Sequence, residues 1–231
     1  MAHRWQTQGK AHRRGVISPL LAHLYLHYAF DRWMEKCFPH LPFERYADEV
    51  ICHCHSQTQA DRLRRSIQER LTQCKLELHP DKTKIVYCKD EARRYHYPND
   101  KFDFLGYEFR PRWVRNSRRG TLFARFTPAV SPKACKAMRQ TVRSWRLHRQ
   151  TTSRLETVIQ RIRPVLQGWI QYYGYFNRTL LLNALRTIEK YLIRWAIRKY
   201  KRLRRSDVRG QRWLEGLRAR EPGLLPIWLP R

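Results

Sequence analysis

The spacing of apolar residues changes between residues 110 and 130 of this 231-residue chain. Before that region, short runs alternate apolar and polar residues, and amphipathic stretches separate these runs. From Ser131 to Arg205 the apolar residues recur every three or four positions instead. Because a period of two indicates strands and a period near 3.6 indicates helices, the pattern predicts an α+β part followed by an all-α part.

The distribution of charge changes in the same region. The chain carries 48 Lys+Arg and 19 Asp+Glu, a formal net charge of +29. Residues 1–110 hold 19 basic and 14 acidic residues, a net of +5, whereas residues 111–231 hold 29 and 5, a net of +24. A charge of this size predicts a polyanionic partner, and the predominance of Arg, which binds two phosphate oxygens at once, favours nucleic acid. No apolar stretch is long enough to span a bilayer, which disfavours a membrane.

The cysteines and the first residues bear on the compartment. Six cysteines show no disulfide-framework spacing, and Met1 to Trp5 lack the apolar region of a signal peptide, so we expect reduced thiols and a cytoplasmic protein. The run Cys52-His53-Cys54-His55 suggests zinc. On a strand, however, its thiols and imidazoles would lie on opposite faces, so we expect no zinc site there.

Individual elements follow from the same patterns. A helix is expected over residues 17–36, with Ser18 as its N-cap and Leu20, Leu24, Phe30 and Met34 at helical spacing. A second helix over 56–74 has one apolar face. The remaining expectations are a strand–turn–strand over 43–54, a strand over 83–87, a hairpin joining 102–109 to 121–126 through a basic turn at 110–120, and a packed extended tail over 222–231.

Two adjacent carboxylates, Asp48 and Glu49, are expected at the turn of the 43–54 segment, where they can face a groove. Paired carboxylates hold divalent metal ions against phosphates in nucleotidyl transfer. A solvated turn with no chemical role is the alternative interpretation of the same two residues.

Five segments resemble, in order and approximate spacing, blocks of group II intron reverse transcriptases. The last of them resembles the core of the maturase domain of that family, and the likeness extends from about Gly15 to the C-terminus. The segments are Gly15-Val16-Ile17-Ser18-Pro19-Leu20-Leu21-Ala22, Arg45-Tyr46-Ala47-Asp48-Glu49, His79-Pro80-Asp81-Lys82-Thr83-Lys84, Phe102-Asp103-Phe104-Leu105-Gly106-Tyr107-Glu108-Phe109, and Ile162-Arg163-Pro164-Val165-Leu166-Gln167-Gly168-Trp169-Ile170-Gln171-Tyr172-Tyr173.

The resemblance implies an architecture in three parts. Residues 1–112 would form part of a reverse-transcriptase palm built of β-hairpins with helices, residues 113–130 a basic hairpin or linker, and residues 131–231 a thumb-like maturase-specific helical domain. The implied activity is RNA-directed DNA polymerisation together with binding and splicing of intron RNA.

The resemblance also implies roles for single residues. Asp48 would bind Mg²⁺ in a two-metal reaction, and Glu49 would be the second catalytic carboxylate. The nucleotide and primer would lie near the residues Tyr46, Ala47, Lys82, Phe104, Leu105 and Gly106. Of these, Phe104-Leu105-Gly106 corresponds to the primer-grip turn of the family, whereas for Lys82 we favour a solvated side chain.

Three departures from the family pattern bear on activity. The motif has Glu49 where the family has a second Asp, and His12-Arg13-Arg14-Gly15 stands where the family has Pro-Gln-Gly-Gly. The family also has a metal-binding Asp upstream, and no Asp or Glu precedes Gly15 here. We therefore expect a chain truncated at its N-terminus that does not polymerise alone and would need a separate segment to complete its palm.

The basic residues of the second half predict contact with structured RNA through phosphates and stacking. The candidate residues are Arg143, Arg146, Arg161, Arg163, Arg194, Arg198, Lys199, Lys201, Arg202, Arg204 and Arg205. Eight aromatic residues lie among them, and we expect about two-thirds of these to pack in the helical core.

Three functions remain open on the sequence. The first is an intron-encoded reverse transcriptase that also contacts a DNA primer or target. The second is an RNA-binding maturase that supports splicing without catalysis, and the third is the decayed remnant of a mobile element. No Cys-pair endonuclease module is present between residue 205 and Arg231, so DNA cleavage is not expected.

Overall fold

The computed structural model describes residues 2–6 as backbone and residues 17–91, 97–116, 120–204 and 206–229 with their side chains. The chain divides into two compact units. Unit 1 comprises residues 1–104 and 110–126, and unit 2 comprises residues 105–109 and 127–231. The mixture of small antiparallel sheets and many helices confirms the predicted α+β class.

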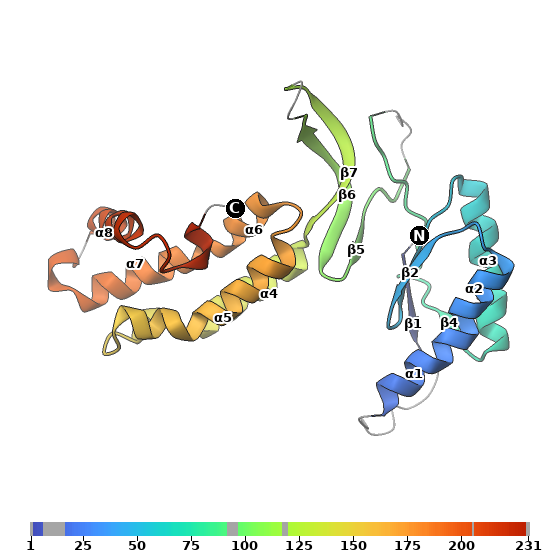
Figure 1. Ribbon diagram of the computed structural model, residues 1–231, viewed down its shortest axis with the longest axis horizontal. Helices are drawn as coiled ribbons and strands as arrows, with labels where there is room; N and C mark the ends of the chain where they lie inside the picture. Colours follow the sequence, from blue (N-terminus) through green and yellow to red (C-terminus); the bar gives the residue numbers. More distant parts are fainter. Residues whose placement is uncertain (1, 7–16, 92–96, 117–119, 205, 230–231) are drawn as a thin grey trace. The chain divides into compact units, whose positions relative to one another are not determined.

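Unit 1 contains a four-stranded sheet in the order β2-β3-β1-β4, and helices α1, α2 and α3 lie against one face of it (Figure 1). Strands β2 and β3 confirm the predicted strand–turn–strand. The elements are β1 (Ala2–Gln6), α1 (Ser18–Leu26), the π-helical segment η1 (His27–Asp31), α2 (Arg32–Cys37), β2 (Phe43–Tyr46), β3 (Glu49–Cys52), α3 (Gln57–Gln73) and β4 (Glu77–Leu78).

The helix predicted over 17–36 is present, but its cap and its buried face differ from the prediction. Ile17 is the N-cap and offers no side-chain hydrogen bond, while Ser18 is already helical. Phe30 and Met34 are fully buried, whereas Leu20 and Leu24 are 67% and 53% exposed. A π-helical turn winds the helix by one extra residue per bonded turn, so η1 shifts the buried face away from the one that the spacing of leucines indicates.

Helix α3 has the predicted form. The Ser56 hydroxyl caps it by accepting a hydrogen bond from the Gln59 amide at 3.2 Å. Its buried face is the predicted one and packs against Phe30, Met34 and Val50 in the core of unit 1. The buried residues of the helix are Ala60, Leu63, Ile67 and Leu71.

The strand predicted over 83–87 is wrong. Only Lys84 makes an isolated bridge there, and the strand nearest to it is the two-residue β4. The backbone is satisfied irregularly instead: the Tyr87 amide donates to the Asn99 carbonyl at 2.9 Å, and the Asn99 side chain donates to the Ile85 carbonyl at 3.4 Å. Alternation of β-branched residues therefore marks a half-buried segment here rather than a strand.

A second sheet has the order β5-β6-β7. Its strands are β5 (Phe102–Phe104), β6 (Tyr107–Arg115) and β7 (Leu122–Val130). The predicted hairpin exists, but Leu105 and Gly106 form a turn that splits its first half into β5 and β6. The strand β6 continues to Arg115, so half of the predicted basic turn at 110–120 is strand, and residues 117–119 lie outside the described part.

Unit 2 is helical from Pro132 onward (Figure 1). Helical structure continues past Arg205, where the pattern predicted its end, and the predicted tail packs with Leu225, Ile227 and Trp228 buried. The elements are α4 (Pro132–Ser144), η2 (Leu147–Arg149), α5 (Leu155–Tyr173), α6 (Arg178–Leu185), α7 (Thr187–Lys199), η3 (Lys201–Leu203), α8 (Asp207–Arg220) and η4 (Pro226–Trp228).

One apolar core holds unit 2 together. Leu166, Leu181, Leu185, Ile188 and Trp195 are fully buried and come from α5, α6 and α7. Burial of a large apolar side chain contributes roughly 1.5–3 kcal/mol, so this cluster fixes the helices that carry the basic residues.

Candidate functional site

The carboxylate pair lies at the turn between β2 and β3, as predicted. Tyr46 pairs with Glu49 across the hairpin, which leaves Ala47 and Asp48 as the two turn residues. Ala47 has a left-handed backbone, with φ of 52°. Asp48 and Glu49 are half-buried, and Tyr46 is 61% exposed. The turn therefore presents two carboxylates and one aromatic ring from consecutive positions.

The Arg45 side chain connects this turn to Asp31. Its Nε and Nη2 donate to the two carboxylate oxygens of Asp31 at 2.6 and 2.5 Å, and its Nη1 donates to the Ala47 carbonyl at 3.1 Å. The Arg45 and Asp31 side chains are only 9% and 15% exposed. A bidentate, largely buried pair of this kind is directional, so Arg45 ties the π-helical segment η1 to the strained turn beside Asp48. Sequence reasoning missed this pair, because Asp31 lies 14 residues away with no motif around it.

The turn offers too few ligands for a two-metal site. Two Mg²⁺ ions require several oxygen ligands each at near-octahedral positions. Asp48 and Glu49 are adjacent, but nowhere in the described part of the chain do three or more His, Cys, Asp or Glu side chains group to hold a metal. The described residues thus do not fit the family-implied magnesium pair.

Two other candidates in unit 1 are the Lys82 side chain and the Cys52–His55 run. Lys82 is exposed on the turn that follows β4, where its Nζ is available to solvent. Within the Cys52–His55 run, Cys52 is buried and Cys54 half-buried while both imidazoles are exposed, which is the predicted alternation. Burial raises the pKa of the Cys52 thiol to about 12.

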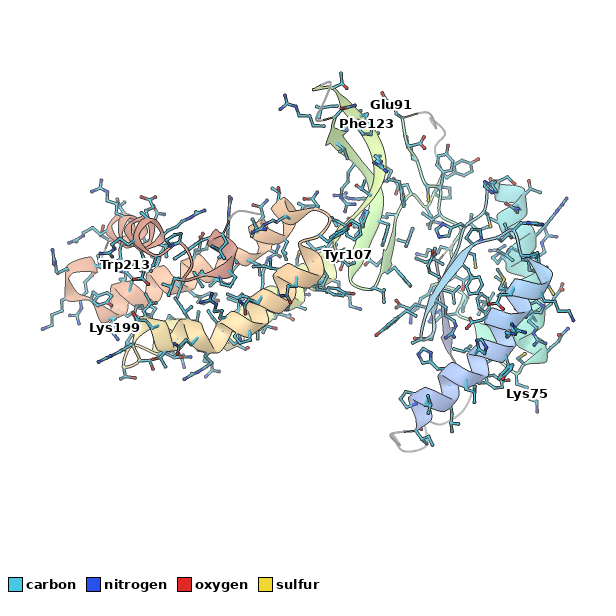
Figure 2. The ribbon with its side chains drawn as sticks, viewed as in Figure 1. Lys75, Glu91, Tyr107, Phe123, Lys199 and Trp213 are labelled. Carbon is cyan, nitrogen blue, oxygen red and sulfur yellow. The ribbon has the colours of Figure 1, made fainter. Side chains whose placement is uncertain are left out.

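Leu105 and Gly106, which the resemblance assigns to the primer-grip turn, form the turn between β5 and β6. Both residues have positive φ, 51° and 78°, as a two-residue type I′ hairpin turn requires. Within unit 2, the Tyr172 hydroxyl donates to the Leu105 carbonyl at 2.9 Å, and the Tyr107 hydroxyl donates to the Tyr172 carbonyl. The Tyr107 ring, labelled in Figure 2, also contacts the Tyr173 ring at an interplanar angle of 54°, with centroids 5.3 Å apart. The end of α5 therefore holds this turn rigidly.

The basic candidates of unit 2 are mostly at its surface. Arg163 and Lys199 are half-buried, Arg205 lies outside the described residues, and the other eight candidates are exposed. From residue 131 to residue 229, leaving out Arg205, no Lys or Arg side chain pairs with a carboxylate. Ion pairs such as Arg45–Asp31 and Arg32–Glu35 lie in unit 1 instead. These guanidinium groups are therefore available to an external anion.

The aromatic residues of unit 2 divide differently from the prediction. Trp195 is fully buried, and Trp145, Trp169 and Tyr173 pack against the core. The remaining four of the eight are exposed, so half of these rings lie in the core and not the expected two-thirds. The exposed rings are Tyr172, Tyr175, Phe176 and Tyr200, at 50%, 71%, 49% and 39%. Unit 2 thus has more aromatic surface for stacking than the sequence indicated.

Comparison with known families finds a match in each part of the chain. Residues 13–109 match the family model of the reverse transcriptase (RNA-dependent DNA polymerase), and residues 135–213 match that of the group II intron maturase-specific domain. No curated protein matches the chain significantly. No helix among the described residues is both long and apolar enough to cross a membrane.

Proposed function

We propose that this chain, which belongs to the family of group II intron reverse transcriptases and maturases, acts by binding intron RNA through unit 2. Along the chain, the segment that matches the reverse transcriptase precedes the segment that matches the maturase-specific domain. Binding of intron RNA follows from both domains, and the proposal assigns it to the surface of unit 2. It also includes a DNA primer or target as a further partner and the cytoplasm as the location of the complex.

The observation that carries the proposal is the set of exposed basic side chains without carboxylate partners in the described part of unit 2. An ion pair within the protein would have to be broken before phosphate could bind, whereas these groups exchange only water and counterions. Arg also stacks on bases and binds phosphate with two donors at once. The rings of Tyr175 and Phe176, 71% and 49% exposed, add aromatic surface for sequence-tolerant stacking.

The proposal excludes polymerisation by this 231-residue chain alone. Asp48 and Glu49 provide two carboxylates from one turn, and the residues before Gly15 include no Asp or Glu to add a third. Arg13 and Arg14 bring positive charge to the segment that precedes α1. A single turn with two carboxylates does not hold two ions at the spacing that in-line displacement needs.

The experiment is a pair of assays on the purified chain. Fluorescence anisotropy with a folded intron RNA measures binding, and primer extension on an RNA template with Mg²⁺ measures polymerisation. We expect tight binding without extension. Robust extension would contradict the exclusion of polymerisation, and absence of binding at near-physiological salt would contradict the maturase function itself.

A second candidate, reverse transcription together with a separate polypeptide, is favoured by one observation. Helix α1 exposes an apolar stripe that includes Ile17, Leu20, Leu21, Leu24 and Tyr28 at 53–67% exposure. Exposed apolar patches rimmed by polar residues mark interaction sites. A polypeptide carrying the upstream metal-binding Asp would restore the missing ligand if it docked there. Mixing such a segment with the chain and assaying primer extension tests this candidate, and Leu20→Glu is the variant expected to abolish any gain.

A further inference from the structure

One side of α7 packs against the turn that contains η2. The Trp195 indole Nε1 donates to the Gln150 carbonyl at 2.8 Å, and the Lys199 ammonium, labelled in Figure 2, donates to the Ser153 carbonyl. The Arg198 Nη1 donates to the His148 carbonyl at 3.3 Å. Because Trp195 is fully buried, these bonds fix the turn on a rigid helix.

Four arginines act electrostatically on the His148 imidazole at this junction. Arg146 and Arg149 come from the turn, and Arg194 and Arg198 come from α7. All four side chains are exposed. The imidazole itself stacks on the Tyr191 ring, with centroids 5.8 Å apart and an interplanar angle of 29°, and the Arg194 Cζ lies 5.7 Å from the centroid of the same ring.

The charge around His148 is of one sign. Burial lowers the pKa of His148, and Arg198, Arg149, Arg194 and Arg146 lower it further, in that order. No carboxylate contributes to this shift. The Nδ1 atom of His148 is buried and has no hydrogen-bond partner in the described structure. Four cations that have no carboxylate partner among the described residues form an arrangement that an anion would stabilise.

The backbone at Arg146 is strained in a way that builds this cluster. Arg146 has φ of 47° and ψ of 39°, the left-handed region, which is unfavourable for a residue other than Gly, Asn or Asp. The strain reverses the chain after α4, and the Arg149 amide then donates to the Arg146 carbonyl at 2.8 Å. Strained residues of this kind concentrate at functional sites.

We propose that Arg146, Arg149, Arg194 and Arg198 form a binding site for a backbone phosphate of structured RNA, beside the stacked His148 and Tyr191 rings. The inference rests on the proposed function and assigns one local site within it. Two of the four arginines can hold the phosphate with paired donors, while the other two supply longer-range attraction. The bound anion would also favour the protonated imidazole, so RNA binding should take up a proton at His148.

The test compares two double variants of the full chain that lose the same charge. Arg149→Gln with Arg194→Gln removes two groups of the cluster, neither of which makes a side-chain hydrogen bond within the described residues. Arg218→Gln with Arg220→Gln removes two exposed arginines from the end of α8 and serves as the matched control. We expect the cluster variant to bind a folded intron RNA at least about tenfold more weakly, the loss of one charge-assisted hydrogen bond, and the control to change less than about threefold. Arg149→Lys with Arg194→Lys keeps the charge but lacks the paired donors of the guanidinium group. Its RNA affinity should lie between those of the other two double variants.

A second readout follows His148 directly. NMR titration of the His148 ring in the wild-type chain should give a higher pKa with bound RNA than without it, and this rise should vanish in the cluster variant but persist in the control. Equal losses of affinity in both double variants would overturn the local site and leave RNA binding by unit 2 intact. A response of His148 to inorganic phosphate but not to RNA would likewise overturn it. Failure of the wild-type chain to bind RNA is a different result and would contradict the proposed function.

Discussion

The Arg45 guanidinium holds both carboxylate oxygens of Asp31, at 2.6 and 2.5 Å, while a third nitrogen of the same group donates to the turn beside Asp48. Because both side chains are largely buried, removal of one partner leaves an uncompensated charge. We predict that Asp31→Ala destabilises unit 1 by about 3 kcal/mol. Hydrogen exchange of the β2 and β3 amides measures the change.

The matched control for that variant is the ion pair between Arg32 and Glu35. Its side chains are 65% and 55% exposed, and its atoms are 3.2 Å apart. Exposed pairs contribute about 0–1 kcal/mol, so Glu35→Ala should leave the exchange of the same amides nearly unchanged. Equal effects of the two substitutions would show that Arg45 does not fix the turn.

Gly106 tests the turn at the start of β6. Its φ of 78° is unfavourable for any residue with a Cβ, and an added Cβ would also lie 2.6 Å from the Tyr173 hydroxyl. We predict that Gly106→Ala destabilises unit 2 by roughly 1–2 kcal/mol, measured by urea unfolding. Gly216→Ala is the control, since α8 has open space at Gly216 and Ala is the better helix former, so stability should rise by roughly 0.5–1 kcal/mol. A stable Gly106→Ala variant would contradict the requirement for a left-handed residue there.

Cys52 should behave as an inert thiol. Burial raises its pKa from 9.0 to about 12, so the folded protein keeps it protonated at pH 8, whereas the exposed Cys37 is accessible to reagents. We predict that iodoacetamide at pH 8 modifies Cys37 and spares Cys52, as mass spectrometry of the peptides will show. Rapid modification of Cys52 in the folded chain would contradict its burial.

The same shift predicts how stability depends on alkaline pH. The unfolded chain ionises Cys52 above about pH 9, while the folded chain holds it neutral, so the stability it contributes is full below pH 9 and declines as pH rises toward about 12. The decline is roughly 1.4 kcal/mol per pH unit for one such group. Unfolding curves of wild type and Cys52→Ala between pH 8 and 11 measure it, and parallel pH profiles would refute it.

His148 gives the corresponding prediction on the acid side. Its pKa in the folded chain lies below the ordinary 6.5, chiefly through burial and then through the neighbouring arginines. The unfolded state therefore binds the proton more readily, so the stability of unit 2 is retained above pH 6.5 and falls as pH drops below it. Thermal unfolding from pH 7.5 to 5 should show this fall in the wild type and a shallower one in His148→Gln. An identical fall in both proteins would mean that His148 is not responsible.

Local patterns in the sequence anticipate the elements whose own residues decide their structure. Ala60 and Leu71 lie on the apolar face of α3 that the spacing indicates, and Ser56 caps that helix with its own side chain. In contrast, β1 pairs with β3 and β4, and its sequence, Ala2–Gln6, has no apolar alternation to reveal it. Helix α8 is similarly obscured by Gly210 and Gly216, which are poor helix formers.

The candidate site also has features that the local sequence predicts and features that only the fold creates. The turn at Asp48 follows from the strand pattern on either side of it. The contacts of Arg45 with Asp31 and of Tyr172 with Leu105 join residues 14 and 67 positions apart, so only the folded chain brings them together. The four-arginine cluster likewise depends on the left-handed backbone of Arg146, which no propensity for Arg predicts.

The most direct test of the central claim, that unit 2 binds structured RNA through unpaired arginines, is a salt titration of RNA affinity. The measurement is the dissociation constant of the full chain for a folded intron RNA across a series from about 50 to 200 mM salt, the range over which phosphate-driven affinities fall steeply. The account predicts a linear decline of log affinity with log salt, corresponding to several neutralised phosphates. A flat response would contradict it.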